Sequence, residues 1–112
     1  MTNSDSMTVA AVRAKVPLKY NNRVVSHGPA GTTVTLHGKP CVKISPDART
    51  VELSGEIKPT RKSCRLFNAI LSVYTGCRTF TRQNKWFLET ADKEKISFTD
   101  QIVSIPATAG MN

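Results

Sequence analysis

The chain has few cysteines and no long apolar run, and both shortages exclude whole classes of protein. Its three cysteines, Cys41, Cys64 and Cys77, are too few and too odd in number for a disulfide framework, so we expect a reducing, cytoplasmic setting. No apolar stretch approaches the roughly 18 residues of a membrane span. Residues 1–6 are polar and lack the basic-then-apolar order of a signal peptide. We therefore expect a small cytoplasmic protein without a membrane partner.

Acidic residues are also scarce, and they are unevenly placed. Sixteen Lys and Arg against eight Asp and Glu give a formal net charge of +8. No acid occurs in residues 6–46 or in residues 57–88. The second of these stretches carries a run of basic residues, namely Lys58, Arg61, Lys62, Arg65, Arg78, Arg82 and Lys85. A basic cluster on one folding unit indicates an anionic partner, most often nucleic acid.

The length of 112 residues allows one domain with a modest core. We expect residues 1–31 to be a flexible or partly ordered N-terminal segment. Within it, residues 7–16 leave helix and strand both open, and residues 21–31 are typical of a loop because they contain Asn-Asn, His-Gly-Pro and Ala-Gly. Residues 32–105 should form a single α+β domain, followed by a frayed C-terminus over residues 106–112.

Alternating apolar and polar residues predict short antiparallel strands on both sides of one helix. The expected strands before the helix cover residues 32–36, 41–45 and 49–53, and those after it cover 78–82, 86–89, 96–98 and 102–105. Thr60 is the expected N-cap of the helix, and Gly76 stands where a C′ glycine belongs. This order predicts a small antiparallel β-sheet with one main α-helix packed on a face.

The two faces of the expected helix differ in character. Its apolar face carries residues at three- and four-residue spacing, namely Leu66, Phe67, Ile70, Leu71 and Tyr74. Arg61, Arg65, Asn68 and Ser72 fall on the other face. Lys58, Arg61, Lys62 and Arg65 stand in or near the first turn, where the helix dipole disfavours cations. Together with the free N–H groups of that turn they form a candidate phosphate site. A solvated face, or contact with an acidic protein, is the alternative.

The expected hairpin over residues 78–88 interleaves aromatic and basic residues. With period two, Arg78, Phe80 and Arg82 share one face of their strand. An aromatic ring beside two arginines is typical of single-strand binding, because stacking tolerates any base and the charges follow the backbone. Aromatic residues in so small a protein also belong in the core, so we expect at least one of Trp86 and Phe87 there and leave Phe80 open.

Metal and catalytic patterns are weak. His37, Cys41, Cys64 and Cys77 are possible zinc ligands, but the chain has no Cys-x2-Cys pair. Asp47, Glu56 and Lys58 follow the Pro-Asp…Glu-x-Lys order of a magnesium-dependent nuclease. Asp47 is however expected in a turn and Glu56 in the loop before the helix, so we expect them not to converge. The sequence predicts no enzyme, no cofactor and no metal.

A set of short motifs resembles a family of small phage-encoded proteins. The matching features are His37-Gly38, a strand ending at Gly55, Thr60-x-Lys62, Arg65-Leu66 with Asn68, Trp86 in a hairpin, and Phe98-x-Asp100. Members carry a Gly-rich strand end, a Thr-Thr-Lys-x-Arg-Leu-Asn helix start and a late tryptophan, and the resemblance covers about residues 35–105. It implies a phage origin, expression inside a bacterium and an accessory role outside the virion shell.

These patterns together predict a non-enzymatic basic protein that binds nucleic acid, DNA or RNA, through a helix N-terminus and a basic hairpin. The candidate binding residues are Lys58, Arg61, Lys62, Arg65, Arg78, Phe80, Arg82 and Lys85. In the alternative, the protein is an inhibitor that docks on an acidic surface of a host complex. Such a complex would be a nuclease, a polymerase or an anti-phage defence system such as a CRISPR effector.

Overall fold

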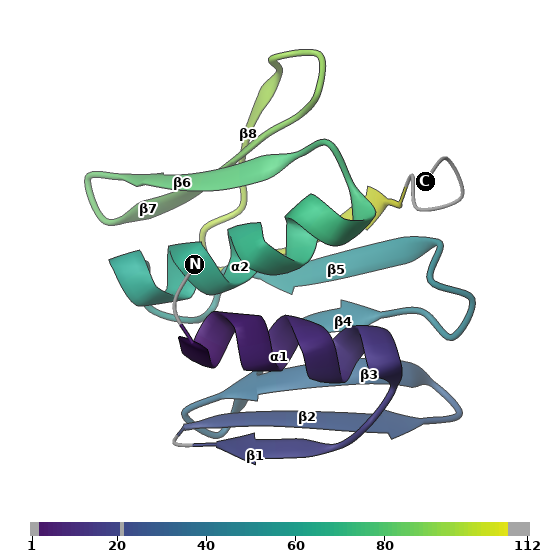
Figure 1. The fold of residues 1–112 in the computed structure, drawn as a ribbon. Coiled ribbons are helices and arrows are strands. Elements are labelled where there is room, and N and C mark those ends of the chain that lie inside the picture. The colour runs from purple at the N-terminus through teal and green to yellow at the C-terminus, as the bar shows by residue number, and fades with distance from the viewer. Residues whose placement is uncertain (1–2, 21, 108–112) are drawn as a thin grey trace.

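The computed structural model describes residues 3–20 and 22–107, and in this part of the chain two helices lie against two antiparallel sheets (Figure 1). The helices are α1 (Asn3–Ala14) and α2 (Arg61–Tyr74). Sheet A, in the order β1-β2-β3-β4-β5-β9, consists of β1 (Leu18–Tyr20), β2 (Arg23–Gly28), β3 (Gly31–Leu36), β4 (Lys39–Ile44), β5 (Thr50–Ser54) and β9 (Ile102–Pro106). Sheet B consists of β6 (Arg78–Arg82), β7 (Lys85–Glu89) and β8 (Lys95–Ser97). The predicted α+β class is confirmed.

Sheet A is covered by helices on one face. Strict alternation puts Val34 and Leu36 of β3, and Val51 and Leu53 of β5, into the core. Both α1 and α2 lie across that face (Figure 1). Lys43 projects from the opposite face, which is open to solvent. The expectation of one helix on a sheet therefore holds for α2, and α1 adds a second helix beside it.

The prediction of a loop over residues 21–31 is wrong, because most of this segment forms strand β2. Arg23 pairs with Leu36 and the register continues to Gly28 opposite Gly31. Turn-forming residues misled the prediction, since they flank this strand at Asn22 and beyond Gly28 instead of filling it. The expected domain boundary at residue 32 falls inside sheet A. Parts of the segments expected to be flexible or frayed, namely residues 1–2, 21 and 108–112, lie outside the described residues.

Polar contacts attach α1 and the residues that follow it to sheet A. Arg23 of β2 forms an ion pair with Asp5 of α1 at 2.5 Å, and both side chains are largely buried. His27 Nε2 donates a hydrogen bond to the carbonyl oxygen of Val16 at 2.9 Å, and His27 Nδ1 lies 2.9 Å from the hydroxyl of Thr32. These contacts explain why α1, which carries only a weak apolar pattern, has a defined place on the sheet.

The remaining strand predictions are confirmed to within one or two residues, and so is the start of α2. Thr60 is its N-cap, since its hydroxyl accepts a hydrogen bond from the backbone N–H of Ser63 at 3.1 Å. The helix ends at Tyr74 and is capped by Thr75, whose N–H and hydroxyl both donate to the carbonyl oxygen of Leu71. Gly76 follows at the expected position but without the left-handed conformation, which Gly31 and Gly38 adopt.

Residues between β5 and β9 leave sheet A and return to it, forming α2 and sheet B on the way; we call this segment the excursion. It starts and ends at adjacent strands, since Ser54 pairs with Ile102. Its neck is closed by hydrogen bonds from Gly55 N to the carbonyl oxygen of Gln101 (2.7 Å) and from Asp100 N to that of Gly55 (3.0 Å). A Cβ atom at Gly55 would overlap the carbonyl oxygen of Phe98, so the neck accommodates only glycine here.

An aromatic cluster fills the space between α2 and sheet B. Trp86 of β7 is fully buried, with its ring centroid 4.8 Å from that of Phe67 and 5.6 Å from that of Phe98. Its indole N–H donates to the carbonyl oxygen of Ile57 at 2.9 Å. The prediction that Trp86 or Phe87 belongs to the core is confirmed by Trp86.

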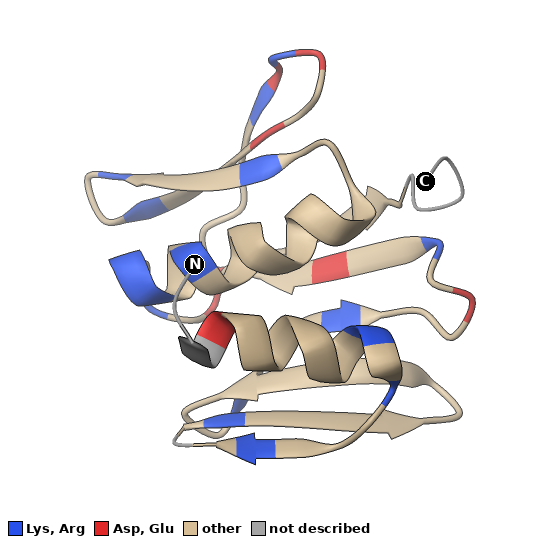
Figure 2. Cartoon of the chain, viewed as in Figure 1, with Lys and Arg blue, Asp and Glu red and all other residues tan. Residues whose placement is uncertain are grey.

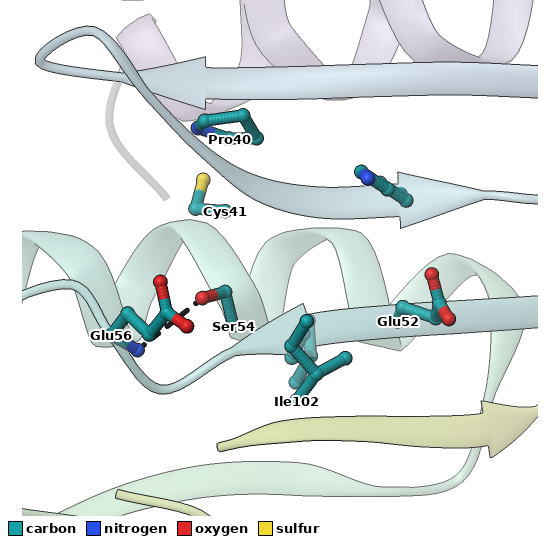
Figure 3. A pocket seen from close by; sticks show the side chains of 8 residues that line it. Pro40, Cys41, Glu52, Ser54, Glu56 and Ile102 are labelled. Carbon is teal, nitrogen blue, oxygen red and sulfur yellow. Dashed lines mark hydrogen bonds between the residues drawn. The ribbon is translucent and has the colours of Figure 1, made fainter. Parts of the chain in front are cut away.

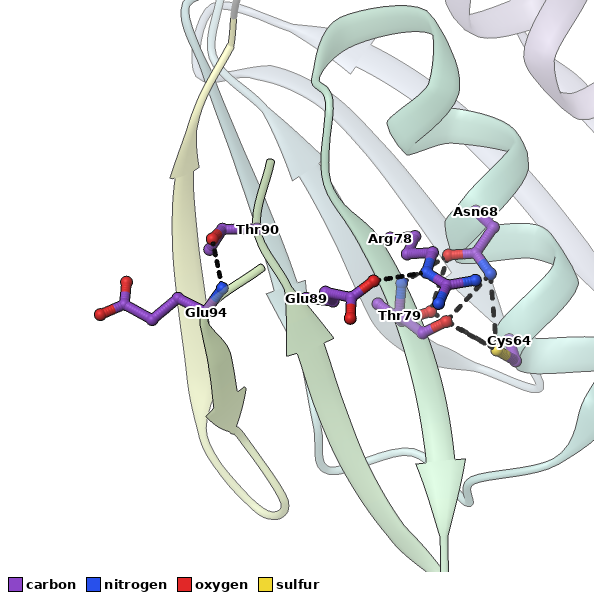
Figure 4. Close-up of polar contacts among 7 residues, drawn as sticks. All are labelled: Cys64, Asn68, Arg78, Thr79, Glu89, Thr90 and Glu94. Carbon is purple, nitrogen blue, oxygen red and sulfur yellow. Dashed lines mark hydrogen bonds and ion pairs between the residues drawn. The ribbon is translucent and has the colours of Figure 1, made fainter. Parts of the chain in front are cut away.

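Asn68 of α2 attaches to the outer edge of sheet B, although the sequence predicted it on the polar helix face (Figure 4). Its Oδ1 accepts hydrogen bonds from the N–H of Thr79 (2.6 Å) and from the Thr79 hydroxyl (3.0 Å). Its Nδ2 donates to the carbonyl oxygen of Thr79 at 3.1 Å. The side-chain amide thus takes the place of a neighbouring strand and covers the edge of β6 at this point.

We predict that Asn68→Ala lowers the free energy of unfolding by about 1–3 kcal/mol, because it leaves the backbone N–H of Thr79 without its partner and the carbonyl oxygen of Thr79 with only the weak thiol donor of Cys64. Urea denaturation followed through Trp86 fluorescence measures this loss. Ser72→Ala is the matched control on the same helix, since the Ser72 hydroxyl is exposed and bonds only to Ala69 one turn back. Equal losses in the two variants would contradict the role of Asn68.

Candidate functional site

The start of α2 and the tip of the β6–β7 hairpin lie at one end of the excursion (Figure 2). Asn68, two turns into α2, bonds to Thr79 near the start of β6. Farther along β6, Thr81 stands opposite Trp86, which bonds to Ile57 just before α2. Strand β6 therefore runs antiparallel to α2, and its end comes back to the start of the helix.

This geometry brings together basic residues that are about 20 positions apart in the sequence. We define the basic surface as the exposed residues Lys58, Arg61, Lys62, Arg65, Arg82 and Lys85. The first turn of α2 contains no acid, so its positive dipole end and its cations repel one another. In the part of the chain that the structure describes, ion pairs engage Arg23, Arg49 and Arg78 and none of the residues of the basic surface.

A tight turn fixes how the hairpin presents its charges. Gln83 and Asn84 form a two-residue loop with φ of 53° and 61°, the left-handed pair typical of a type I′ turn. The resulting register places Arg82 directly opposite Lys85. Two like charges at opposed positions are unfavourable in a sheet, so the hairpin keeps this pair at a cost in stability.

The other predicted residues lie on the outer face of sheet B. Phe80 stands opposite Phe87, and their half-buried rings stack with centroids 5.3 Å apart and planes inclined by 13°. Thr79, Trp86 and Leu88 alternate with them and are buried on the side of α2. Phe80 and Phe87 therefore face away from the helix.

Arg78 differs from the other predicted cations because it has a carboxylate partner (Figure 4). Its Nε donates to Glu89 Oε1 at 2.9 Å, and this hydrogen bond holds the pKa of Glu89 below its usual value. The arginine side chain is 68% exposed, whereas that of Glu89 is 11% exposed. Sequence reasoning missed Lys95 of β8, which follows on the same face opposite Glu89. The period-two alternation of β8 would have identified it only once its register with β7 was known.

The two carboxylates of the possible nuclease pattern, Asp47 and Glu56, lie far from each other. Asp47 lies in the turn before β5, where hydrogen bonds from the Ser45 hydroxyl and the Arg49 N–H lower its pKa. Glu56 lies beyond the other end of β5, which spans five residues at about 3.3 Å each. The two carboxylates cannot hold one Mg²⁺ ion between them, because each would have to approach it to about 2 Å.

The zinc candidates are likewise separated from one another. Burial raises the pKa of Cys41 to about 12, and its thiol donates to the carbonyl oxygen of Val34 at 3.3 Å. Cys64 bonds instead to the carbonyl oxygen of Thr79 at 3.4 Å. Among the described residues no group of three or more His, Cys, Asp and Glu is arranged to hold a metal ion. Neither α1 nor α2 has the length and apolar character needed to span a membrane.

A hollow of about 200 Å³ lies on sheet A, and no residue of the basic surface lines it (Figure 3). Its charged lining consists of Lys43, Glu52 and Glu56. One cation against two carboxylates gives the hollow the wrong sign for a phosphate group. The backbone N–H of Glu56 is already bonded to the Ser54 hydroxyl at 3.3 Å. It does not extend the anion site.

The lowered pKa of Glu89 predicts a pH-dependent contribution to stability. A carboxylate whose pKa is lower in the folded state stabilises the fold above its unfolded-state pKa, about 4.3, and this contribution is lost as the pH falls through the folded-state value. Glu89→Gln removes it. We therefore expect the difference in unfolding free energy between wild type and Glu89→Gln to shrink as the pH falls from about 6 toward the lowered pKa.

Urea denaturation of both proteins across this pH range measures the effect. Glu94→Gln is the control, since Glu94 is an exposed glutamate in the next turn and has no ion pair among the described residues. A difference between wild type and Glu89→Gln that stays constant with pH would contradict the coupling of Glu89 to Arg78.

Comparison of the chain with models of protein families, with curated proteins and with solved structures finds no significant match. The resemblance to small phage-encoded proteins therefore stays a prediction from the short motifs, and the basic surface must be interpreted from its own geometry.

Proposed function

We propose that the protein is a non-enzymatic nucleic-acid-binding protein that holds phosphates on the basic surface. The observation that carries this proposal is the convergence of two basic segments, residues 58–65 and 82–85, at one end of the excursion, where none of the described residues pairs a carboxylate with them. The hydrogen bonds of Asn68 and Trp86 hold the two segments together.

Folding alone gives no reason for this arrangement. The cations oppose the dipole of α2, and Arg82 and Lys85 oppose each other across the hairpin, so both features destabilise the isolated protein. A polyanion turns each of these repulsions into an attraction and releases its own condensed counterions. Phosphate groups also suit the exposed N-terminal end of a helix.

The biological setting follows from the motif resemblance. An accessory protein encoded by a phage would act in the cytoplasm of the infected bacterium, where nucleic acid is abundant.

We predict that binding to oligonucleotides weakens steeply with salt and depends on the start of α2. Arg61→Ala and Arg65→Ala should each weaken binding by about 1 kcal/mol and lower the slope of log K against log salt by about one unit, because each removes one phosphate contact. Mobility-shift titrations at several salt concentrations measure both quantities.

Arg13→Ala and Arg49→Ala are the matched controls. Arg13 lies on α1, and Arg49 lies in the turn before β5 close to the carboxylate of Asp47, so both should have smaller effects. Equal losses of affinity at all four positions would indicate that binding depends on a diffuse electrostatic attraction and not on a defined site. Undetectable affinity at about 50 mM salt would refute nucleic-acid binding. A bacterial protein captured equally well after nuclease treatment would then favour docking on a host complex.

A further inference from the structure

The aromatic residues of the excursion divide between the two faces of sheet B. Trp86 faces α2 and packs against Phe67 and Phe98, all three fully buried. Phe80 and Phe87 lie on the outer face, where they are half-buried and stack on each other. Two of the four phenylalanines of the chain are thus placed outside the main core.

We infer that Phe80 and Phe87 form a stacking platform for the unpaired bases of a single-stranded nucleic acid. This inference rests on the nucleic-acid binding proposed above and specifies the form of the strand. Aromatic side chains stack on the faces of bases regardless of sequence. In a duplex these faces are covered by the neighbouring base pairs, so only an unpaired base has a face free for the two rings.

Cations stand where the phosphates of such a strand would pass. Arg82 and Lys85 form the next cross-strand row after the phenylalanine pair, about 7 Å along the strands. Beyond them the basic surface continues at the start of α2 (Figure 2). On the other side of the pair lies the row of Arg78, Glu89 and Lys95. A strand whose bases lie on the rings therefore has a path for its backbone over the hairpin tip to the helix start.

The charges on the outer face of sheet B favour a single-stranded nucleic acid over an apolar protein segment as the partner of the two phenylalanines. The pair Arg82 and Lys85 has no acidic neighbour in the register of sheet B, so an apolar partner would bury two charges without compensation. A strand with phosphates offers both an acceptor for these cations and a flat apolar surface for the rings. Single-stranded nucleic acid combines these two properties at adjacent positions along its chain.

Fluorescence anisotropy with one labelled oligonucleotide sequence, prepared as single-stranded DNA, as single-stranded RNA and as a blunt DNA duplex, tests the inference. We expect tighter binding of a single strand, DNA or RNA, than of the duplex. Phe80→Leu and Phe87→Leu should each weaken single-strand binding about tenfold, because leucine keeps the apolar contact but cannot stack on a base. Duplex binding, and the salt dependence of single-strand binding, should stay unchanged because no charge is removed.

Two further variants separate stacking from structural damage. Phe80→Tyr keeps an aromatic ring and should retain wild-type affinity. Ile96→Ala removes an exposed apolar side chain of β8 on the opposite face, and it should also leave single-strand binding unchanged. Trp86 fluorescence shows that each variant is folded.

The possible outcomes separate this inference from the proposed function. Equal affinity for single strand and duplex, or single-strand affinity unaffected by both leucine variants, overturns the stacking platform while nucleic-acid binding stands. Absence of binding to all three oligonucleotides in the wild type overturns both. A loss of single-strand binding in the leucine variants together with its retention in Phe80→Tyr supports the platform.

Discussion

Burial of the Trp86 indole is the contact on which the excursion depends. Its ring lies between Phe67 of α2 and Phe98, which follows β8, and its N–H bonds to Ile57 in the segment that leads into α2. One side chain therefore joins the approach to the helix, the helix itself, strand β7 and the segment that follows β8. Removing a buried aromatic side chain of this size costs about 3–5 kcal/mol, a large share of the stability of a small domain.

The anchored excursion gives the basic surface its geometry. Trp86 fixes the start of β7 beside Ile57, and Asn68 fixes β6 along α2, so the hairpin tip cannot move away from the helix start. The repulsion between Arg82 and Lys85, and that between the helix dipole and its first-turn cations, is thus held in place by apolar packing elsewhere. A protein that retains unfavourable charges in a rigid arrangement is prepared to meet a polyanion without reorganisation.

Local signals predicted much of this fold. Thr60 identified the start of α2 and period-two alternation identified β3, β5, β6 and β7, because capping and alternation depend on neighbours in the sequence. Strand β2 was missed because the turn residues at both of its ends made the whole segment resemble a loop, and because the ion pair between Arg23 and Asp5 is a long-range contact that no local pattern indicates. Contacts between strands also limited what the sequence could predict about the candidate binding residues. The sequence identified the basic residues and Phe80, but the stacking of Phe80 on Phe87 and the partner of Arg78 depend on strand register.

Asn68 is a second case in which the sequence does not reveal a contact between elements. Its position on α2 opposite the apolar stripe predicts exposure, and helical periodicity alone does not reveal that a second sheet returns to that face. The neck at Gly55 brings both ends of the excursion together, and the contacts of Trp86 and Asn68 then place sheet B over the helix.

The most direct test of the account is a titration of the isotope-labelled protein with an unlabelled single-stranded oligonucleotide, followed by nuclear magnetic resonance. The account predicts the largest shifts at the rings of Phe80 and Phe87 and at the amides of Arg82, Lys85 and the first turn of α2. Thr33 and Lys43, on the open face of sheet A, should stay unchanged. Shifts concentrated on that open face, or their absence from sheet B, would contradict the account.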